Sequence, residues 1–316
     1  MTYFLGIDGG QSSTRAVIGD EFGRVIGAGR GGPCNHATGP EGRAKFTNAI
    51  RTSVGQAVEQ AGLDQAVRFS SVYAGLSGGP AHKLALLSQV VPNDHAVVAG
   101  DAGIALSGAT AGEPGLVVIA GTGSIAFGRN REGRTAQVGG WGYLFGDEGG
   151  AFWIFREAMR AALAYEEGWG PPTSLRARLL DYALSHDLSV NNVSGLMHLC
   201  YTPEFGRARA ASLATLVNQA ADSRDPAAIE ILDAAARELA SLADAVRVQL
   251  FAPGEAALVS YWGGVFRSRG ISAGFRRRQE SQPGVHVAAP LYEPVFGALI
   301  EAYRAVGRSS IRLETP

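Results

Sequence analysis

The sequence predicts an α/β protein built from two related domains that face each other. Predicted strands alternate with predicted helices through the first half of the chain, which indicates a partly parallel sheet. A three-strand unit with a turn rich in Gly, Ser and Thr occurs twice, which indicates duplication. With 316 residues, of which 46% are hydrophobic, the chain is long enough for two cores rather than one.

The two repeated units are defined by short apolar runs between turn residues. Each unit holds three β-favouring runs separated by small polar residues, a pattern that predicts strands joined by hairpins. The runs are residues 3–7, 14–18 and 25–28 in the first unit, and residues 116–120, 125–128 and 135–138 in the second. The Gly/Ser/Thr turn follows the first run of each unit, so the two units match in layout.

Helical periodicity accounts for much of the remaining chain. Residues 40–62 carry apolar side chains at every fourth position, between a proline and a glycine, and predict a helix. Asp225 and Pro226 supply an N-cap and a first helical residue for a later helix. The further elements expected are strands at 67–76, 96–99 (buried) and 257–261, and helices at 81–91, 151–165, 174–185, 208–221, 226–251 and 293–306.

Glycine and proline residues between positions 108 and 114 predict a hinge between two lobes. We therefore expect a smaller N-terminal lobe at 1–110 and a larger C-terminal lobe at 111–316. The final helix, 293–306, is expected to pack back on the N-terminal lobe.

Composition excludes several classes of partner and site. A net charge of −1, from 28 basic and 29 acidic residues, predicts neither nucleic acid nor an anionic membrane as a partner. Cys34 and Cys200 lack CxxC spacing, which predicts two free thiols rather than a disulfide framework or a metal cluster. We find no signal peptide and no apolar run of membrane-spanning length, and we expect a cytoplasmic protein with a small-molecule ligand.

The chain holds 43 glycines, well above average usage, and many stand in pairs directly after apolar runs. Backbone N–H groups in such turns can approach a ligand closely, and several turns together would suit a polyphosphate. No GxxxxGK[ST] loop occurs, and no GxGxxG leads from a strand into a helix. Phosphate binding by paired hairpin turns is the remaining hypothesis.

Asp8 ends the first apolar run and is the candidate ligand of Mg²⁺ through water. The turn that follows is the first candidate phosphate site, made of Gly9, Gly10, Gln11, Ser12, Ser13 and Thr14. The second candidate site is made of Gly121, Thr122, Gly123 and Ser124. Each motif alone is equally consistent with an ordinary hairpin turn.

Asp101 follows a predicted buried strand and precedes a helical stretch, so it is either a helix N-cap or a general base that accepts a hydroxyl proton. Residues 139–150 read GGWGYLFGDEGG and combine aromatic rings, carboxylates and glycines. The aromatic rings could stack on a sugar and the acids could bind its hydroxyls. Alternatively, the acids of this segment cap the helix that begins near residue 151.

These motifs occur in the order of a known family. They are GIDGGQSST, the pair Asn35-His36, GLSGG, GDAG around Asp101, AGTGS and GGWGYLFGDEGG. The chain resembles the N-acetylglucosamine kinase and BadF-type ATPase branch of the superfamily that also contains actin, acetate kinase and hexokinases. The GGWG and GDEG pair is the specific part of this resemblance, which extends over nearly the whole chain.

The resemblance implies a two-lobed, actin-like ATPase fold of ribonuclease H-like domains, with ATP and Mg²⁺ in the interdomain cleft. It implies that the smaller lobe binds the sugar and phosphate, that the larger lobe binds the nucleotide, and that Asp101 is the catalytic base. The adenosine motif would include Gly263 and Gly264. The sugar-binding set it implies is Asn35, His36, Ser77, Gly78, Gly140, Trp141, Asp147 and Glu148.

The implied activity is ATP-dependent phosphorylation of a hexosamine hydroxyl, O6 of N-acetylglucosamine. Gln11 replaces a common third glycine, and Ala37 stands where a tryptophan is typical, so glucosamine, glucose or a muramic-type sugar stay open as acceptors. A sugar sensor and an ATPase that drives a partner protein are the alternatives from other classes. The cysteines that bridge an iron–sulfur cluster in dehydratase-activating relatives are missing. Such relatives often form homodimers.

Overall fold

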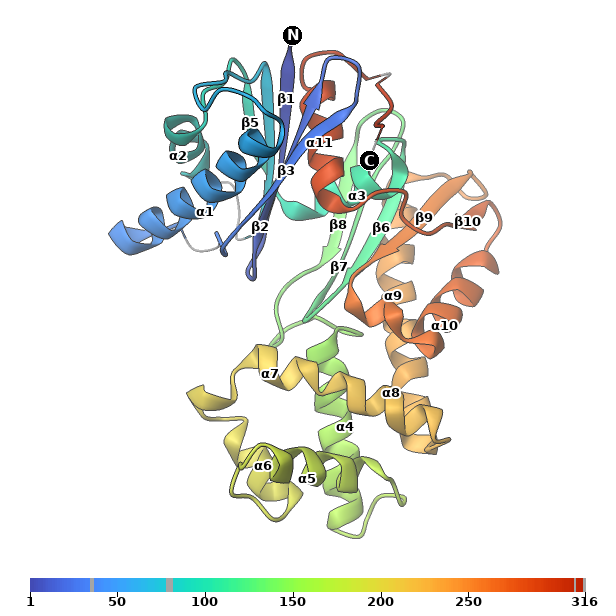
Figure 1. Ribbon diagram of the computed structural model, residues 1–316. Helices are drawn as coiled ribbons and strands as arrows, with labels where there is room; N and C mark the ends of the chain where they lie inside the picture. Colours follow the sequence, from blue (N-terminus) through green and yellow to red (C-terminus); the bar gives the residue numbers. More distant parts are fainter. Residues whose placement is uncertain (35–36, 78–81, 310, 315–316) are drawn as a thin grey trace. The chain divides into compact units, whose positions relative to one another are not determined.

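The computed structural model describes residues 1–34, 37–77, 82–309 and 311–314. The chain divides into two compact units, Met1–Val117 with Ala289–Pro316, and Val118–Ala288 (Figure 1). The division therefore falls later than the expected 110/111 boundary, and the closing segment belongs to the first unit. Gly108, the first residue of the expected hinge, lies inside helix α3 (Asp101–Thr110) and packs against the carbonyl groups of Tyr292 and Glu293.

The first unit contains a five-stranded mixed sheet in the order β3-β2-β1-β4-β5. β1 pairs antiparallel with β2, which pairs antiparallel with β3, whereas the β1–β4 and β4–β5 pairs are parallel. The strands are β1 (Tyr3–Gly9), β2 (Thr14–Asp20), β3 (Val25–Gly31), β4 (Ser71–Leu76) and β5 (Ala96–Ala99). The three predicted N-terminal strands are thus present, but β5 is only half-buried, not buried as expected.

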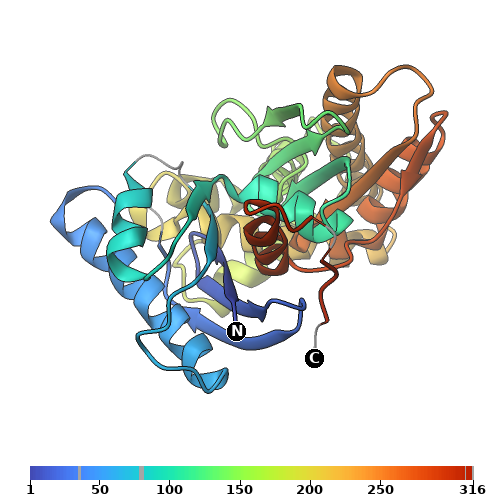
Figure 2. The same cartoon turned by 90° about the horizontal axis from the view of Figure 1, so that it is seen from above.

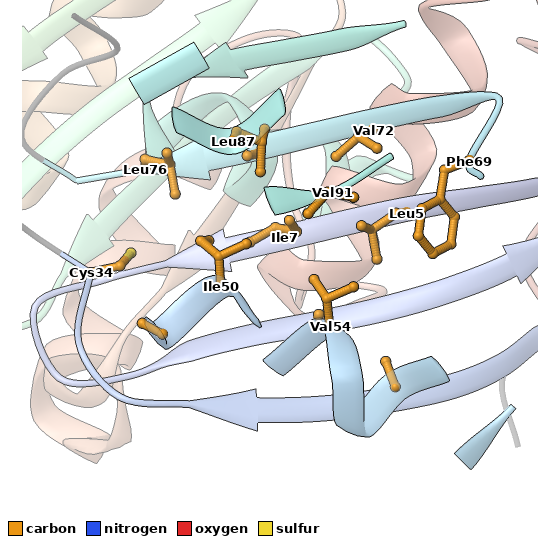
Figure 3. Close-up of a cluster of buried hydrophobic side chains, with 14 of the residues drawn as sticks. Leu5, Ile7, Cys34, Ile50, Val54, Phe69, Val72, Leu76, Leu87 and Val91 are labelled. Carbon is orange, nitrogen blue, oxygen red and sulfur yellow. The ribbon is translucent and has the colours of Figure 1, made fainter. Parts of the chain in front are cut away.

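Helices cover both faces of this sheet. α1 (Gly39–Gln60) packs on β2 and β3, and α2 (Lys83–Val90) packs on α1 and β5. α11 (Pro294–Arg304) packs on β1, β4 and α3, as the view in Figure 2 shows. Successive side chains of a strand point to opposite faces, so Leu5 joins the core under α1 and Phe4 joins the core under α11. Figure 3 shows the α1 core, which extends to Cys34.

The second sheet repeats the order of the first. Its order is β10-β9-β6-β7-β8, and counting from β6 gives the same arrangement as counting from β1. The strands are β6 (Gly115–Ala120), β7 (Ser124–Arg129), β8 (Thr135–Gly139), β9 (Ala257–Trp262) and β10 (Val285–Val287). The prediction of duplicated α/β domains is confirmed by this shared order.

A helical segment separates β8 from the long helix α9 (Pro226–Leu250), which packs on β7 and β8. The helices of this segment are α4 (Ala151–Glu166), α5 (Leu175–Ser185), α6 (Val193–Leu199), the 3-10 turn η1 (Pro203–Phe205), α7 (Arg207–Ser212) and α8 (Ala214–Asp222). They enclose a core of their own around Phe155, Leu179 and Leu196. The predicted cap of α9 is confirmed, because the Asp225 carboxylate accepts a hydrogen bond from the Ala228 N–H.

Four features of the second unit differ from the expected elements. The single helix expected at 208–221 is divided at Leu213 into α7 and α8. The sequence patterns did not predict α6, the three-residue strand β10, or α10 (Arg269–Glu280), which follows the 3-10 turn η2 (Gly264–Arg267). Among the described residues, no helix is both long and apolar enough to cross a membrane.

Candidate active site

The first turn closes the β1–β2 hairpin at the end where β1 and β4 also stop. Asp8 is the penultimate residue of β1 and lies opposite Arg15 in the register. The Gly10 N–H donates to the Ser13 carbonyl at 3.0 Å, which forms the tight turn. Gly9 ends β1, and Gln11 and Ser12 within the turn are exposed. The backbone and side-chain donors of Gln11 and Ser12 are therefore available to a ligand.

Thr14 differs from the rest of the predicted phosphate turn. Its side chain is fully buried, and its hydroxyl donates to the Gly32 carbonyl at 2.8 Å. Since side chains alternate along β2, Thr14 points into the unit while its neighbour Ser13 is partly exposed. The Thr14 hydroxyl thus joins β2 to the segment after β3.

Asp101 is the first residue of α3, and Gly100 holds the N-cap position. Asp101 is therefore inside the helix, so the N-cap alternative is wrong. Its Oδ2 instead accepts a hydrogen bond from the Ser77 hydroxyl at 2.5 Å. The Ser77 N–H donates to the Gly9 carbonyl at 3.0 Å, so Ser77 connects the first turn to Asp101.

Asp8 and Asp101 are close enough for the charge of Asp101 to affect the pKa of Asp8. Burial raises the pKa of Asp8 from its ordinary 3.8 to about 6, and repulsion from the Asp101 carboxylate is the next largest cause. Arg15 opposes this rise, but its guanidinium is in an ion pair with Glu293, which itself raises the pKa of Asp8. Asp8 therefore favours a cation beside it. A Mg²⁺ ion held by one or two carboxylates, water and phosphate fits such an environment.

Lys83 lies beside Ser77 and near Asp101, and no sequence motif predicted a role for it. The residue is 3% exposed, and its ammonium donates to the Ser77 carbonyl at 2.5 Å. Burial lowers the pKa of Lys83, while the nearby Cys34 and Asp101 raise it. Composition offered a signal, because Lys83 and Lys45 are the only lysines among 28 basic residues.

The second turn, Gly121 to Ser124, is built into the helical part of its unit. The N–H groups of Ala151 and Phe152, at the start of α4, donate to the carbonyls of Gly121 and Thr122 at 2.9 and 3.0 Å. The Ser124 hydroxyl donates to the Glu148 carbonyl at 2.6 Å, so it is already engaged. Thr122 is exposed and is the hydroxyl of this turn that a ligand can reach.

Asp147 supports this turn from behind. Its side chain is 6% exposed, forms an ion pair with Arg207, and accepts a hydrogen bond from the Ser124 N–H at 3.3 Å. A Cβ atom at Gly123 would lie 2.3 Å from the Asp147 carboxyl carbon, which explains the glycine. α4 has Gly150 at its N-cap with no side-chain capping bond, so the alternative that Asp147 or Glu148 caps this helix is wrong.

The rest of the predicted sugar-binding loop faces outward. Gly140 and Trp141 are exposed, Trp141 with 76% of its surface, and the Glu148 side chain is partly exposed. Tyr143 lies under the guanidinium of Arg207, 5.2 Å from ring centre to Cζ. Asn35, His36 and Gly78, also predicted to bind sugar, lie outside the described residues.

A pocket of about 1150 Å³ opens inside the second unit. Gly121 and Gly264 line it, as do residues of α8 and α10 such as Asn218 and Arg277. Gly263 has a φ of 110° and its Cα faces the backbone of Ala120, where a Cβ would lie 2.3 Å from the carbonyl oxygen. The glycine pair therefore lets the chain after β9 lie directly beside the second turn, next to the pocket.

A family model described as the BadF/BadG/BcrA/BcrD ATPase family matches residues 5–302. The chain belongs to this family.

Among the described residues, no group of three or more His, Cys, Asp or Glu side chains could hold a metal ion by itself. A Mg²⁺ ion beside Asp8 would therefore depend on water and phosphate oxygens for most of its ligands.

Curated relatives and a solved structure cover almost the whole chain. An N-acetylmuramic acid/N-acetylglucosamine kinase of Clostridium acetobutylicum is 30% identical over 96% of this chain and 98% of its own length. An N-acetyl-D-glucosamine kinase of Dictyostelium discoideum is 30% identical over 95% of this chain and 97% of its own. A Chromobacterium violaceum structure, described as a candidate N-acetylglucosamine kinase, is 28% identical, with a TM-score of 0.74 over 95% of this chain and 98% of that one.

Proposed function

We propose that this chain is an ATP-dependent sugar kinase that transfers the γ-phosphoryl group to O6 of N-acetylglucosamine. The observation that carries the proposal is the meeting of Asp8 and Asp101 at one end of the first sheet, where burial and mutual repulsion raise the pKa of Asp8. Buried carboxylates whose ionised form is destabilised by a neighbouring carboxylate are typical of functional sites. The names of the two full-length curated relatives support a sugar as the phosphoryl acceptor.

Asp101 is the proposed general base. Ser77 donates to Oδ2, which leaves Oδ1 without a hydrogen-bond donor from the described residues. That oxygen can accept the proton of an attacking hydroxyl while the Ser77 hydroxyl holds the carboxylate plane. Asp101 makes no ion pair with a described residue, so no guanidinium or ammonium competes directly for the same oxygen.

Each of the two glycine turns is proposed to bind phosphate. The exposed N–H and hydroxyl groups of Gln11, Ser12 and Thr122 are suited to hold phosphate oxygens. Asp8 is the proposed carboxylate for Mg²⁺, which when bound would neutralise charge on the transferred phosphoryl group. Positioning and electrostatic stabilisation supply most of the rate in phosphoryl transfer, so these residues act chiefly by holding the phosphates in place.

The pocket beside Gly264 is the proposed site of the nucleoside. Apolar residues such as Ile154 and Leu232 line it together with polar residues such as Asn218. Ligand pockets combine apolar lining with polar groups that fix the orientation of the ligand, and a nucleoside offers both kinds of surface. The pocket lies next to Gly121, which allows one nucleotide to contact both features.

The test is the release of ADP by the purified protein with Mg²⁺-ATP and a panel of sugars. The panel contains N-acetylglucosamine, glucosamine, N-acetylmannosamine, N-acetylmuramic acid and glucose. We expect turnover with N-acetylglucosamine. In the NMR spectrum of the product, the phosphorus should couple to the two protons on C6, which shows that O6 carries the phosphate. We also expect the 6-deoxy analogue to compete with the sugar without being phosphorylated.

Three outcomes would change the proposal. Turnover confined to glucosamine, glucose or N-acetylmuramic acid would keep the kinase and change the acceptor. Phosphorylation of the 6-deoxy analogue would exclude O6. ADP release that is the same with and without every sugar would identify an ATPase, and no release at all would favour a sensor.

A further inference from the structure

Lys83 stands at a position that is unfavourable for a lysine in two respects. It is the first residue of α2, where the helix dipole repels a cation, and no acidic residue stands in the first turn. It is also 3% exposed, and burial disfavours its charged form. Neither the helix position nor the burial stabilises a charged lysine, so the presence of the ammonium group here needs another explanation.

The contacts of Lys83 form a continuous path to Asp101. The ammonium donates to the Ser77 carbonyl at 2.5 Å, and the Ser77 hydroxyl donates to Asp101 Oδ2 at 2.5 Å. The Ser77 N–H is bonded to Gly9 at 3.0 Å, so all three polar groups of Ser77 are engaged. The backbone of Ser77 is therefore held on both sides while its hydroxyl donates to Asp101.

Lysine is a rare residue in this chain, so its presence at position 83 points to a specific requirement for an ammonium group. The chain has 28 basic residues, and Lys45 and Lys83 are its only lysines, so arginine holds nearly every other basic position. A lysine ammonium is a compact point charge, whereas a guanidinium is a planar fork that suits carboxylates. The single carbonyl of Ser77 suits an ammonium group, whereas a guanidinium suits a carboxylate such as Asp101.

We propose that Lys83 is a positioning residue for phosphoryl transfer, which orients Asp101 through Ser77 without touching the substrate. The ammonium holds the Ser77 carbonyl, and Ser77 in turn holds one oxygen of Asp101 so that the other faces the hydroxyl to be deprotonated. This inference rests on the proposed function for its chemistry. The Lys83–Ser77–Asp101 relay itself can be tested without any turnover.

The first test uses the rarity of lysine. Protein labelled with [ε-¹³C]lysine should give two side-chain signals, and Lys45→Met removes the one that belongs to the exposed Lys45. We expect Asp101→Asn and Ser77→Ala to shift the Lys83 signal and not the Lys45 signal. Asp94→Asn is the matched control, because Asp94 is an exposed carboxylate just before β5, whereas Asp101 follows the strand. A Lys83 signal that ignores Asp101 and Ser77 would overturn the relay.

The second test is kinetic. Lys83→Met keeps an unbranched side chain without the ammonium group and should lower kcat by about 100-fold, the size of effect that a small misplacement of a catalytic group produces. We expect KM for the sugar to change less than about threefold and thermal stability to be unchanged or higher, because an unfavourable charge is removed. Lys45→Met should leave kcat, KM and stability as they are.

The double variant decides whether Lys83 acts through Ser77. Residues that act as one unit lose no more together than singly, so Lys83→Met with Ser77→Ala should match the slower single variant. Independent losses that multiply, an unchanged kcat in Lys83→Met, or a loss explained by unfolding would each overturn the proposal. If the wild-type protein phosphorylates no sugar, the proposed function fails, whereas the lysine signals still decide whether the relay exists.

Discussion

In the first unit, Asp8 and Asp101 form no ion pair with a described residue, whereas in the second unit Asp147 is paired with Arg207 and bonded to the Ser124 N–H. All three carboxylates lie in or beside glycine-containing motifs of the sequence. Their environments are nevertheless opposite. Burial and repulsion raise the pKa of Asp8, while the charge of Asp147 is neutralised by an arginine.

The difference separates carboxylates that are available for chemistry from one that holds the fold. An unpaired carboxylate near a second one destabilises the folded chain, and it can be relieved by a metal ion or a proton. A paired and hydrogen-bonded carboxylate has no such unmet need. We therefore expect Asp8 and Asp101 to act on ligands and Asp147 to hold the second turn in shape, which differs from the direct sugar contact that the resemblance implied for it.

The strongest way to break this comparison is Asp101→Asn. Loss of the general base should lower kcat/KM by about 10³-fold, with sugar affinity unchanged within about threefold, because the amide keeps the shape and the Ser77 contact. Steady-state kinetics and sugar binding by calorimetry measure the two effects. Asp94→Asn is the control, and weaker sugar binding with turnover preserved would remove Asp101 from the role of base.

Asp8→Asn should stabilise the protein while it abolishes Mg²⁺-dependent turnover. The folded state holds a proton on Asp8 more tightly than the unfolded state, since its pKa is about 6 rather than 3.8. Ionisation of Asp8 therefore costs stability progressively from pH 4 to 6 and fully above pH 6, up to about 3 kcal/mol. Thermal unfolding at pH 4.5 and 7.5 without Mg²⁺ should show a gain for the variant that is larger at pH 7.5.

Arg207→Met should have the opposite character and destabilise the second unit. It leaves the Asp147 carboxylate buried without its partner, and we expect a loss of about 2 kcal/mol, less than for a fully buried pair because Arg207 is 34% exposed. Asp147→Asn keeps the left-handed backbone (φ 65°), which asparagine tolerates. Denaturant unfolding of both single variants and the double variant should show coupling. Additive losses would mean that the ion pair stabilises nothing.

Trp141→Ala tests the exposed loop of the second unit and should have the smallest effect. Its side chain is 76% exposed, so stability should change by less than about 0.5 kcal/mol. If the ring stacks on the sugar, KM should rise about fivefold, which corresponds to about 1 kcal/mol. An unchanged KM would exclude Trp141 from the sugar site.

Local patterns in the sequence predicted much of the framework. The two hairpin units, the helix after the first of them and the Asp225 cap all depend on residues within a few positions of each other. The short strand β10 and helix α10 were not predicted, and α10 carries the basic run Arg276, Arg277 and Arg278. Arg277 lines the pocket and Arg278 is paired with Asp233 at 2.7 Å.

The sequence alone determined which motifs are candidates for chemistry, because a phosphate turn needs glycine and a base needs a carboxylate wherever the chain folds. Only the tertiary structure decided which of those groups stay available. Thr14, Ser124 and Asp147 belong to the predicted motifs, yet each is bonded to a partner 18 or more positions away. The same packing brings Lys83 to the Ser77 carbonyl and Asp101 to the Ser77 hydroxyl. Such contacts depend on how distant segments pack, and no local pattern of residues encodes them.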